Sequence, residues 1–249
     1  MAVQKSILKI EGTVGGLTFY KSGGVHLVKE KGGVSAAKIA NDPNFARTRE
    51  NNEEFGSAGT AGKVLRDALR VLMLTASDSL ITSRVTSLMH NAMKLDTTSV
   101  RGKRTPATGL TLDEGKALLK GFNFNANALL GTVLYKSLFV DIASGTVSIG
   151  GITPSTDIAA PAGSSHVSFT SALANVNFET GESDIKLSPA TNMIIDGTMT
   201  DINLSPTEIP QGSGLNLVLL KVEFFQEVNS VQYPLKNGAY NALAIVDVA

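Results

Sequence analysis

The sequence predicts an α+β protein made of an N-terminal β-hairpin arm, a helical hairpin and an antiparallel β-sandwich. Apolar and polar residues alternate near the N-terminus, and apolar residues then recur at helical spacing between positions 60 and 92. Beyond position 134, short alternating runs are separated by turn residues. We therefore expect a hairpin arm over residues 1–32, a helical region over 33–104, and a sandwich domain with a short leading helix over 105–249.

The predicted arm is short and rich in glycine. Residues 7–11 and 17–21 alternate, and the turn residues 22–24 precede a third run at 25–30. Gly12, Gly15 and Gly16 interrupt the first run and indicate a tight bend. Because a ribbon of two or three strands is marginal on its own, its apolar side chains need a cover. Either the helices of the same chain or another subunit can supply that cover.

The helical region begins at Asp42-Pro43, an N-cap followed by a proline at the first helical position. We expect this first helix to end near Gly56. Apolar stripes over 60–74 and 81–92, joined by a short connection, predict an antiparallel helix pair. A capping box at 111–114 predicts a last small helix that ends near Gly121.

The second half is typical of an antiparallel sandwich, with about seven strands separated by turns. The expected strands cover residues 134–142, 146–152, 167–178, 184–187, 193–199, 215–228 and 240–248.

Composition excludes several classes of function. The 249-residue chain has 22 Lys and Arg, 22 Asp and Glu, three His and no Cys. The missing cysteines exclude disulfides, thiol catalysis and zinc-finger sites, and the balanced charge argues against a nucleic-acid partner. The N-terminus lacks the apolar stretch of a signal peptide, and no apolar run is long enough to cross a bilayer. We expect synthesis in the cytoplasm without membrane insertion.

The neutral total conceals two oppositely charged halves. Residues 1–104 carry 16 Lys and Arg against 9 Asp and Glu, whereas residues 105–249 carry 6 against 13. Attraction between the positive half of one copy and the negative half of another explains both excesses at once. The alternative is that each set of charges is solvated separately or pairs within one chain.

Motifs for chemistry are weak. Residues 56–63 resemble a phosphate loop, but the spacing fails and Val64 replaces the required hydroxyl residue. The histidines His26, His90 and His166 have no metal-ligand spacing, and the carboxylates of 179–184 miss the calcium-loop pattern. We therefore predict no enzyme, no catalytic residue, no metal and no cofactor, and the sequence identifies no small-molecule substrate.

The N-terminal third is similar to a known group of proteins. GTVGGLTFYK at 12–21, VHLVKEKGG at 25–33 and NDPNFARTREN at 41–51 resemble an uncharacterised family of Bacteroidota proteins. In that family a glycine-punctuated hairpin precedes an Arg- and Phe-rich helical segment and a variable β-rich remainder. The resemblance implies a structural protein of a phage-like particle and assigns no catalytic residue.

These observations favour a non-enzymatic subunit that self-assembles into a homopolymeric tube, filament or virion-like particle. The sequence leaves open both retention of such a particle in the cell and its release. Arm exchange and contacts between opposite charges would hold the copies together. The alternative is a β-sandwich binding module that recognises a protein or a glycan. The predicted assembly interface consists of Leu17, Phe19, Tyr20, Val25, Leu27, Val28, Arg47, Arg49, Arg101, Lys103 and Arg104.

Overall fold

The computed structural model describes residues 2–5, 7–235 and 240–249, so residues 1 and 6 of the predicted arm lie outside the described residues. The chain divides into two compact units, Met1–Glu50 (unit 1) and Asn51–Ala249 (unit 2). Helices and antiparallel sheets are both present, which confirms the α+β prediction. The division between the units does not coincide with the boundaries expected after residues 32 and 104.

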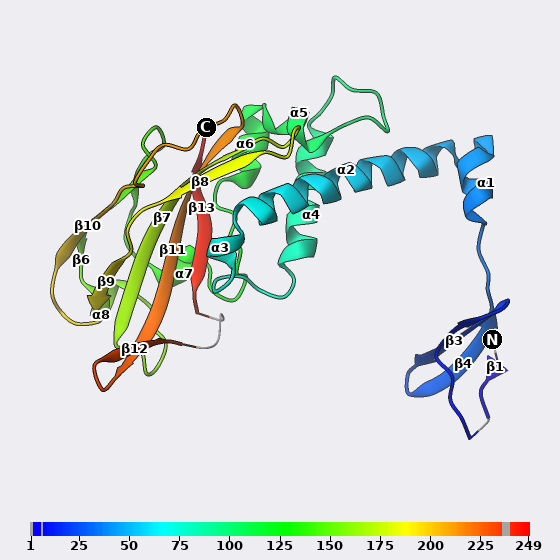
Figure 1. Cartoon of the computed structure of the whole chain (residues 1–249), viewed down its shortest axis with the longest axis horizontal. Coiled ribbons are helices and arrows are strands. Elements are labelled where there is room, and N and C mark those ends of the chain that lie inside the picture. The colour runs from blue at the N-terminus through cyan, green and yellow to red at the C-terminus, as the bar shows by residue number, and fades with distance from the viewer. Residues whose placement is uncertain (1, 6, 236–239) are drawn as a thin grey trace. The chain divides into compact units, whose positions relative to one another are not determined.

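Unit 1 contains a four-stranded antiparallel sheet with the order β1-β4-β3-β2 (Figure 1). Its strands are β1 (Ala2–Val3), β2 (Gly12–Val14), β3 (Leu17–Ser22) and β4 (Val25–Glu30). Gly23 and Gly24 both have positive φ, at 57° and 81°, which suits the two-residue turn between β3 and β4.

The strand expected at residues 7–11 is wrong, because these residues form the loop between β1 and β2. The backbone of Ile10 forms hydrogen bonds with the side chain of Gln4 instead of with a neighbouring strand. Gln4 Nε2 donates to the Ile10 carbonyl at 3.1 Å, and the Ile10 amide donates to Gln4 Oε1 at 3.0 Å. The alternation of apolar and polar residues over 7–11 predicts a strand, because it contains no sign of such a side-chain hydrogen bond.

The sheet is followed by α1 (Ala36–Asn41), a 3-10 turn (Pro43–Phe45) and the long helix α2 (Ala46–Ala68). Asp42 caps the 3-10 turn as expected, since its side chain accepts from the Asn44 amide at 2.9 Å. The helix end expected near Gly56 is wrong, because α2 runs through Gly56 and ends at Ala68. Buried contacts of Ala58, Ala61 and Leu65 override the low helix propensity of the glycines.

The remaining helices of unit 2 are short apart from α4. They are α3 (Arg70–Met73), α4 (Ile81–Lys94), α5 (Pro106–Leu110), α6 (Asp113–Leu119), α7 (Leu130–Val133) and α8 (Pro154–Asp157). Helices α2 and α4 cross instead of running antiparallel (Figure 1). They meet closely at Gly62, where an added Cβ would lie 3.3 Å from Val85 Cγ1. The capping box at 111–114 is also not formed, since α6 begins after Leu112 without a side-chain cap.

Unit 2 contains two antiparallel sheets. The larger has the order β12-β11-β7-β8, with β13 also paired to β11 and β9 to β7, and the smaller has the order β10-β6-β5. In chain order the strands are β5 (Phe139–Asp141), β6 (Thr146–Ile152), β7 (His166–Val176), β8 (Ser183–Leu187), β9 (Thr191–Ile194), β10 (Thr200–Leu204), β11 (Leu215–Val228), β12 (Val231–Pro234) and β13 (Ala242–Val248). The long strand expected at 134–142 shrinks to β5, and Leu134 makes only an isolated bridge to Ile158.

The larger sheet is covered on both faces (Figure 1). Along β11, Leu217 and Leu219 join the core formed with α2 and α4. Val218 and Leu220 point the opposite way and join the core shared with β6 and β10. Unit 2 is therefore built in three layers, with helices on one side of the larger sheet and the smaller sheet on the other.

The close contacts of two glycines predict a measurable sensitivity to an added methyl group. A Cβ at Gly109 would overlap the carbonyl of Ala92, and one at Gly115 would overlap the carbonyl of Gly109. We expect Gly109→Ala and Gly115→Ala each to lower the free energy of unfolding by about 1–3 kcal/mol or more. Gly131→Ala is the matched control, because nothing lies within 4 Å of its added Cβ. Equal urea denaturation midpoints for all three variants would contradict the packing described here.

Candidate self-association surface

The predicted apolar interface residues of the arm lie on both faces of the unit 1 sheet. Phe19 pairs with Val28 across β3 and β4, and Leu17, two residues before Phe19, shares their face. Tyr20 pairs with Leu27, and these two side chains lie on the opposite face. Val25 shares that second face, because it lies two residues before Leu27. The six residues therefore form two apolar surfaces instead of one.

Neither surface is covered. No described residue between 2 and 50 is buried, whereas buried side chains begin at Glu54 in unit 2. Leu17 and Val25 are exposed, and Phe19, Tyr20, Leu27 and Val28 are half-buried. A sheet whose apolar side chains stay this accessible has little hydrophobic stabilisation of its own.

The β1–β2 loop adds a third apolar feature that the sequence reasoning missed. Ile7 is 102% exposed, Leu8 79% and Ile10 47%. A strand over residues 7–11 with one covered face predicts that some of these side chains are buried, whereas all three are exposed. A signal of this exposure is that Ile7 and Leu8 lie between Lys5 and Lys9, and Ile10 directly follows Lys9.

The two predicted interface arginines of unit 1, Arg47 and Arg49, make contacts within the helical segments around them. Arg49 Nη1 donates to the carbonyls of Ile39 at 2.7 Å and Asp42 at 3.0 Å, at the C-terminal end of α1. Arg47 lies 2.8 Å from Glu50, one turn along α2. Arg47 is exposed, so this pair contributes little to stability.

The three predicted cations of the 101–104 loop all contact α2. Arg104 forms a two-pronged pair with Glu54, with both nitrogen–oxygen distances at 2.7 Å. The Gly102 amide donates to the same carboxylate at 2.8 Å. Lys103 lies 2.9 Å from Glu53, and Arg101 donates to Asn51 at 2.9 Å. We call this set the α2 latch, because it ties the loop to the helix.

Hydrogen bonds set the charge state of two buried carboxylates, Glu54 in the α2 latch and Asp96, which accepts from the Thr105 amide. The hydrogen bond from Arg104 lowers the pKa of Glu54 from its ordinary 4.5 to about 2, against the opposing effect of burial. Burial also opposes ionisation of Asp96, but hydrogen bonds from Ser99, Thr105 and Thr98 keep the pKa of Asp96 well below its usual range. Both groups are therefore anions at neutral pH. The carboxylate of Glu54 already neutralises much of the positive charge of Arg104 within the chain.

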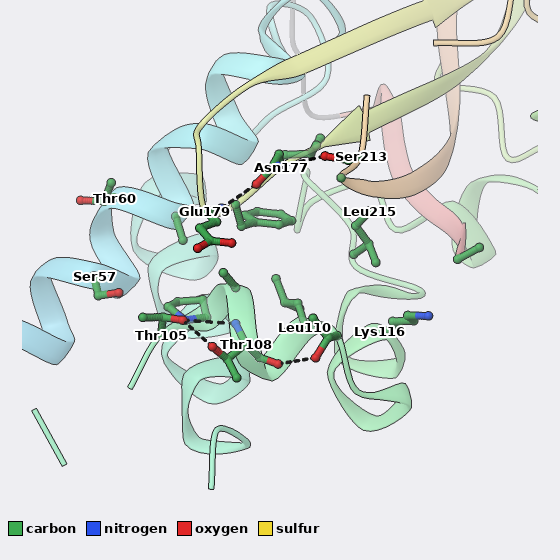
Figure 2. A pocket seen from close by; sticks show the side chains of 18 residues that line it. Ser57, Thr60, Thr105, Thr108, Leu110, Lys116, Asn177, Glu179, Ser213 and Leu215 are labelled. Atoms are coloured by element: carbon green, nitrogen blue, oxygen red, sulfur yellow. Dashed lines mark hydrogen bonds between the residues drawn. The ribbon is translucent and has the colours of Figure 1, made fainter. Parts of the chain in front are cut away.

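Unit 2 also has a pocket of about 960 Å³ (Figure 2). It lies between α2, α5, the end of β7 and the start of β11. Its apolar lining consists of Ala61, Pro106, Ala107, Leu110, Val176, Phe178 and Leu215. Hydroxyl groups of Ser57, Thr60, Thr105, Thr108, Thr111 and Ser213 surround this lining.

The charged side chains of the pocket are few. Glu179 is exposed and lies on the other side of the pocket from Lys116 (Figure 2). Thr105 and Thr108 bond to one another, with their oxygens 3.0 Å apart. No histidine lines the pocket, so it lacks the usual general base. Its chemistry suits binding of an apolar group.

The other candidate motifs lie apart. Residues 56–63 form part of helix α2, so their amides are not arranged as a phosphate loop. His26 lies 3.6 Å from Glu11 in unit 1, and His166 lies 3.4 Å from Glu227 in unit 2. Within the described ranges, no three His, Asp or Glu side chains gather in a way that could hold a metal ion.

Comparisons of the chain with models of protein families, with curated proteins and with solved structures find no match. The resemblance of the N-terminal third to Bacteroidota proteins stays a prediction. Among the helices of the described residues, none combines the length and apolar character needed to cross a bilayer.

The α2 latch predicts a loss of stability in acid. The lowered pKa of Glu54 stabilises the fold fully above about pH 5, and this contribution disappears as the pH falls towards 2. We expect Glu54→Gln to lower the free energy of unfolding at pH 7 by roughly 2–4 kcal/mol and to flatten its pH dependence between 5 and 2. Glu53→Gln is the matched control, because its pair with Lys103 is exposed and contributes about 1 kcal/mol at most. Urea titrations across this pH range measure both effects, and parallel curves for the two variants would refute the assignment.

Proposed function

We propose that the protein is a non-enzymatic structural subunit that self-assembles into a homopolymeric tube, filament or virion-like particle. The observation that supports it is the unit 1 sheet, which has apolar side chains on both faces and no buried residue among those described. Such a sheet gains most of its missing stabilisation when a neighbouring molecule covers it.

The edges of the same sheet favour contacts through the backbone. The edge strands β1 and β2 contain only two and three residues. Exposed edges can pair with a strand of another sheet, but edges this short supply only a few backbone hydrogen bonds, so the apolar side chains must supply most of the affinity. Arm exchange between copies is the form of assembly that these features support best.

Charge supports a contact between unlike surfaces. Residues 1–50 carry eight Lys and Arg against four Asp and Glu, and residues 51–249 carry 14 against 18. Unit 1 of one copy is therefore attracted to unit 2 of another. A contact between two different surfaces of identical copies is heterologous, and it produces rings or open filaments.

In this proposal the two packed sheets of unit 2 serve as an antiparallel sandwich, and the crossed helices α2 and α4 pack against one side of it. This body carries the arm and needs no cofactor. The N-terminal sequence, which lacks the apolar stretch of a signal peptide, supports synthesis in the cytoplasm, and the resemblance to Bacteroidota proteins favours a role in a phage-like particle that could be released from the cell.

A binding module is the second candidate, and the pocket of unit 2 is the observation that favours it. Its apolar lining suits a segment of a protein better than a glycan. Glycan sites commonly use tryptophan or tyrosine as a stacking platform, whereas Phe178 is the aromatic side chain in this lining.

Removal of the arm provides a direct test of assembly. We expect the full chain to form polymers that sediment and are visible by negative-stain microscopy, and deletion of residues 1–32 to abolish them. The deletion removes no buried residue, so the thermal unfolding midpoint of the remainder should be unchanged. Polymers that persist without the arm would exclude its role, and a full chain that stays monomeric at high concentration and low salt would exclude the function itself.

A further inference from the structure

We propose that the β1–β2 loop of one copy docks into the unit 2 pocket of a second copy. The apolar residues Ile7, Leu8 and Ile10 would enter the pocket between α2, α5, β7 and β11. This inference rests on the proposed function, and it names the surface that receives the arm.

The loop has the character of an insertion element. Ile7 and Leu8 are among the most exposed large apolar side chains of the described chain, at 102% and 79%. Bonds from Gln4 shape the loop, since its side chain holds Ile10 and its carbonyl accepts from Lys9 Nζ at 2.6 Å. The described part of the loop that these bonds hold, at Lys9 and Ile10, loses less conformational freedom when it binds.

The pocket is suited to these side chains. Its volume of about 960 Å³ lies near the upper end of the range for ligand pockets, roughly 300–1,000 Å³. Phe178, in the turn after β7, and Leu215, on β11, are both partly exposed and offer apolar contacts in the pocket. The pocket can therefore remove several aliphatic side chains from water, which is the main source of affinity in such a contact.

Charge complements the apolar contact. Lys5 and Lys9 flank Ile7 and Leu8 in the sequence, and Glu179 is an exposed carboxylate of the pocket. Glu182 follows in the same turn and accepts from the Thr180 hydroxyl at 3.2 Å. Lys116 lies on the other side of the pocket, which leaves the Glu179 side for the lysines of the loop (Figure 2).

The two surfaces favour a second copy of this chain as the occupant. The loop belongs to unit 1 and the pocket to unit 2, so a copy that inserts its loop still offers its own pocket. An apolar protrusion that fits a pocket elsewhere on the same molecule makes a heterologous contact, which extends from copy to copy. This is the contact that a filament, ring or tube requires.

Disulfide trapping between copies tests the docking, because the chain has no cysteine of its own. Ile7→Cys protein is mixed with Thr60→Cys protein that carries a mass tag, and the mixture is oxidised mildly under assembly conditions. We expect a mixed disulfide dimer, since Thr60 lines the pocket and is exposed. Asn52→Cys is the matched control on α2, because Asn52 is exposed, lies outside the pocket lining and precedes Thr60 by about 12 Å along the helix.

Each outcome decides the inference. Trapping with Thr60→Cys but not with Asn52→Cys supports docking. Polymers without trapping overturn it and leave the proposed function standing, whereas the absence of polymers from the full chain rejects both. Trapping within one chain of the Ile7→Cys/Thr60→Cys variant, together with none in the mixture, places the loop in its own pocket and also overturns the inference.

A concentration series provides a second measurement. Ile7→Asp should raise the concentration at which polymers first appear by about tenfold or more, the effect expected when one aliphatic side chain is no longer buried. Val34→Asp is the control, since Val34 is an exposed apolar residue of unit 1 outside the loop. An equal rise for both variants would indicate a general charge effect and contradict docking by the loop.

Discussion

The packing of unit 2 depends on covering both faces of strand β11. This 14-residue strand pairs with β7 along nearly its whole length, and β13 and β12 share its other edge. Its alternate side chains enter two different cores, one with the helices and one with the smaller sheet. Because both faces are covered, the strand is apolar from Leu217 to Leu220 and again at Val222 and Phe224. The buried Lys221 interrupts this run, and its ammonium group lies 3.0 Å from the carboxylate of Glu223.

In unit 1 the backbone groups of the hairpin form hydrogen bonds, but none of the described apolar side chains is buried. The β3–β4 ladder is regular and its turn suits two glycines, so the hydrogen bonds of the hairpin are made locally. Hydrophobic burial needs a second layer, and the described residues of unit 1 provide none. Unit 2 thus has layers that cover both faces of its larger sheet, whereas the described residues of unit 1 provide no second layer. A neighbouring molecule is the simplest source of that second layer.

The sequence predicted elements whose signal is local and missed those set by distant contacts. Strands β3, β4, β6, β7 and β11 were foreseen because alternation or a long apolar run lies within each of them. The continuation of α2 through Gly56 was missed, since it depends on packing that a propensity scale does not include. Of the candidate surface, the role of the apolar arm residues stays a prediction. The pocket joins segments from residue 57 to residue 249, and no local pattern could indicate it.

The α2 latch limits how much of the positive charge of residues 1–104 is available for contacts with another copy. Much of the positive excess of residues 1–104 was expected to face another copy, yet Lys103 and Arg104 already contact Glu53 and Glu54. Breaking the Glu54–Arg104 pair would leave a carboxylate that is only 4% exposed without its partner, so an external anion competes poorly for Arg104. A contact between a lysine of the arm and another copy would leave no buried carboxylate without its partner, because none of the described residues of unit 1 is buried. In the proposed assembly, attraction between copies would therefore be concentrated on the arm, the part of the chain whose described apolar side chains are not buried.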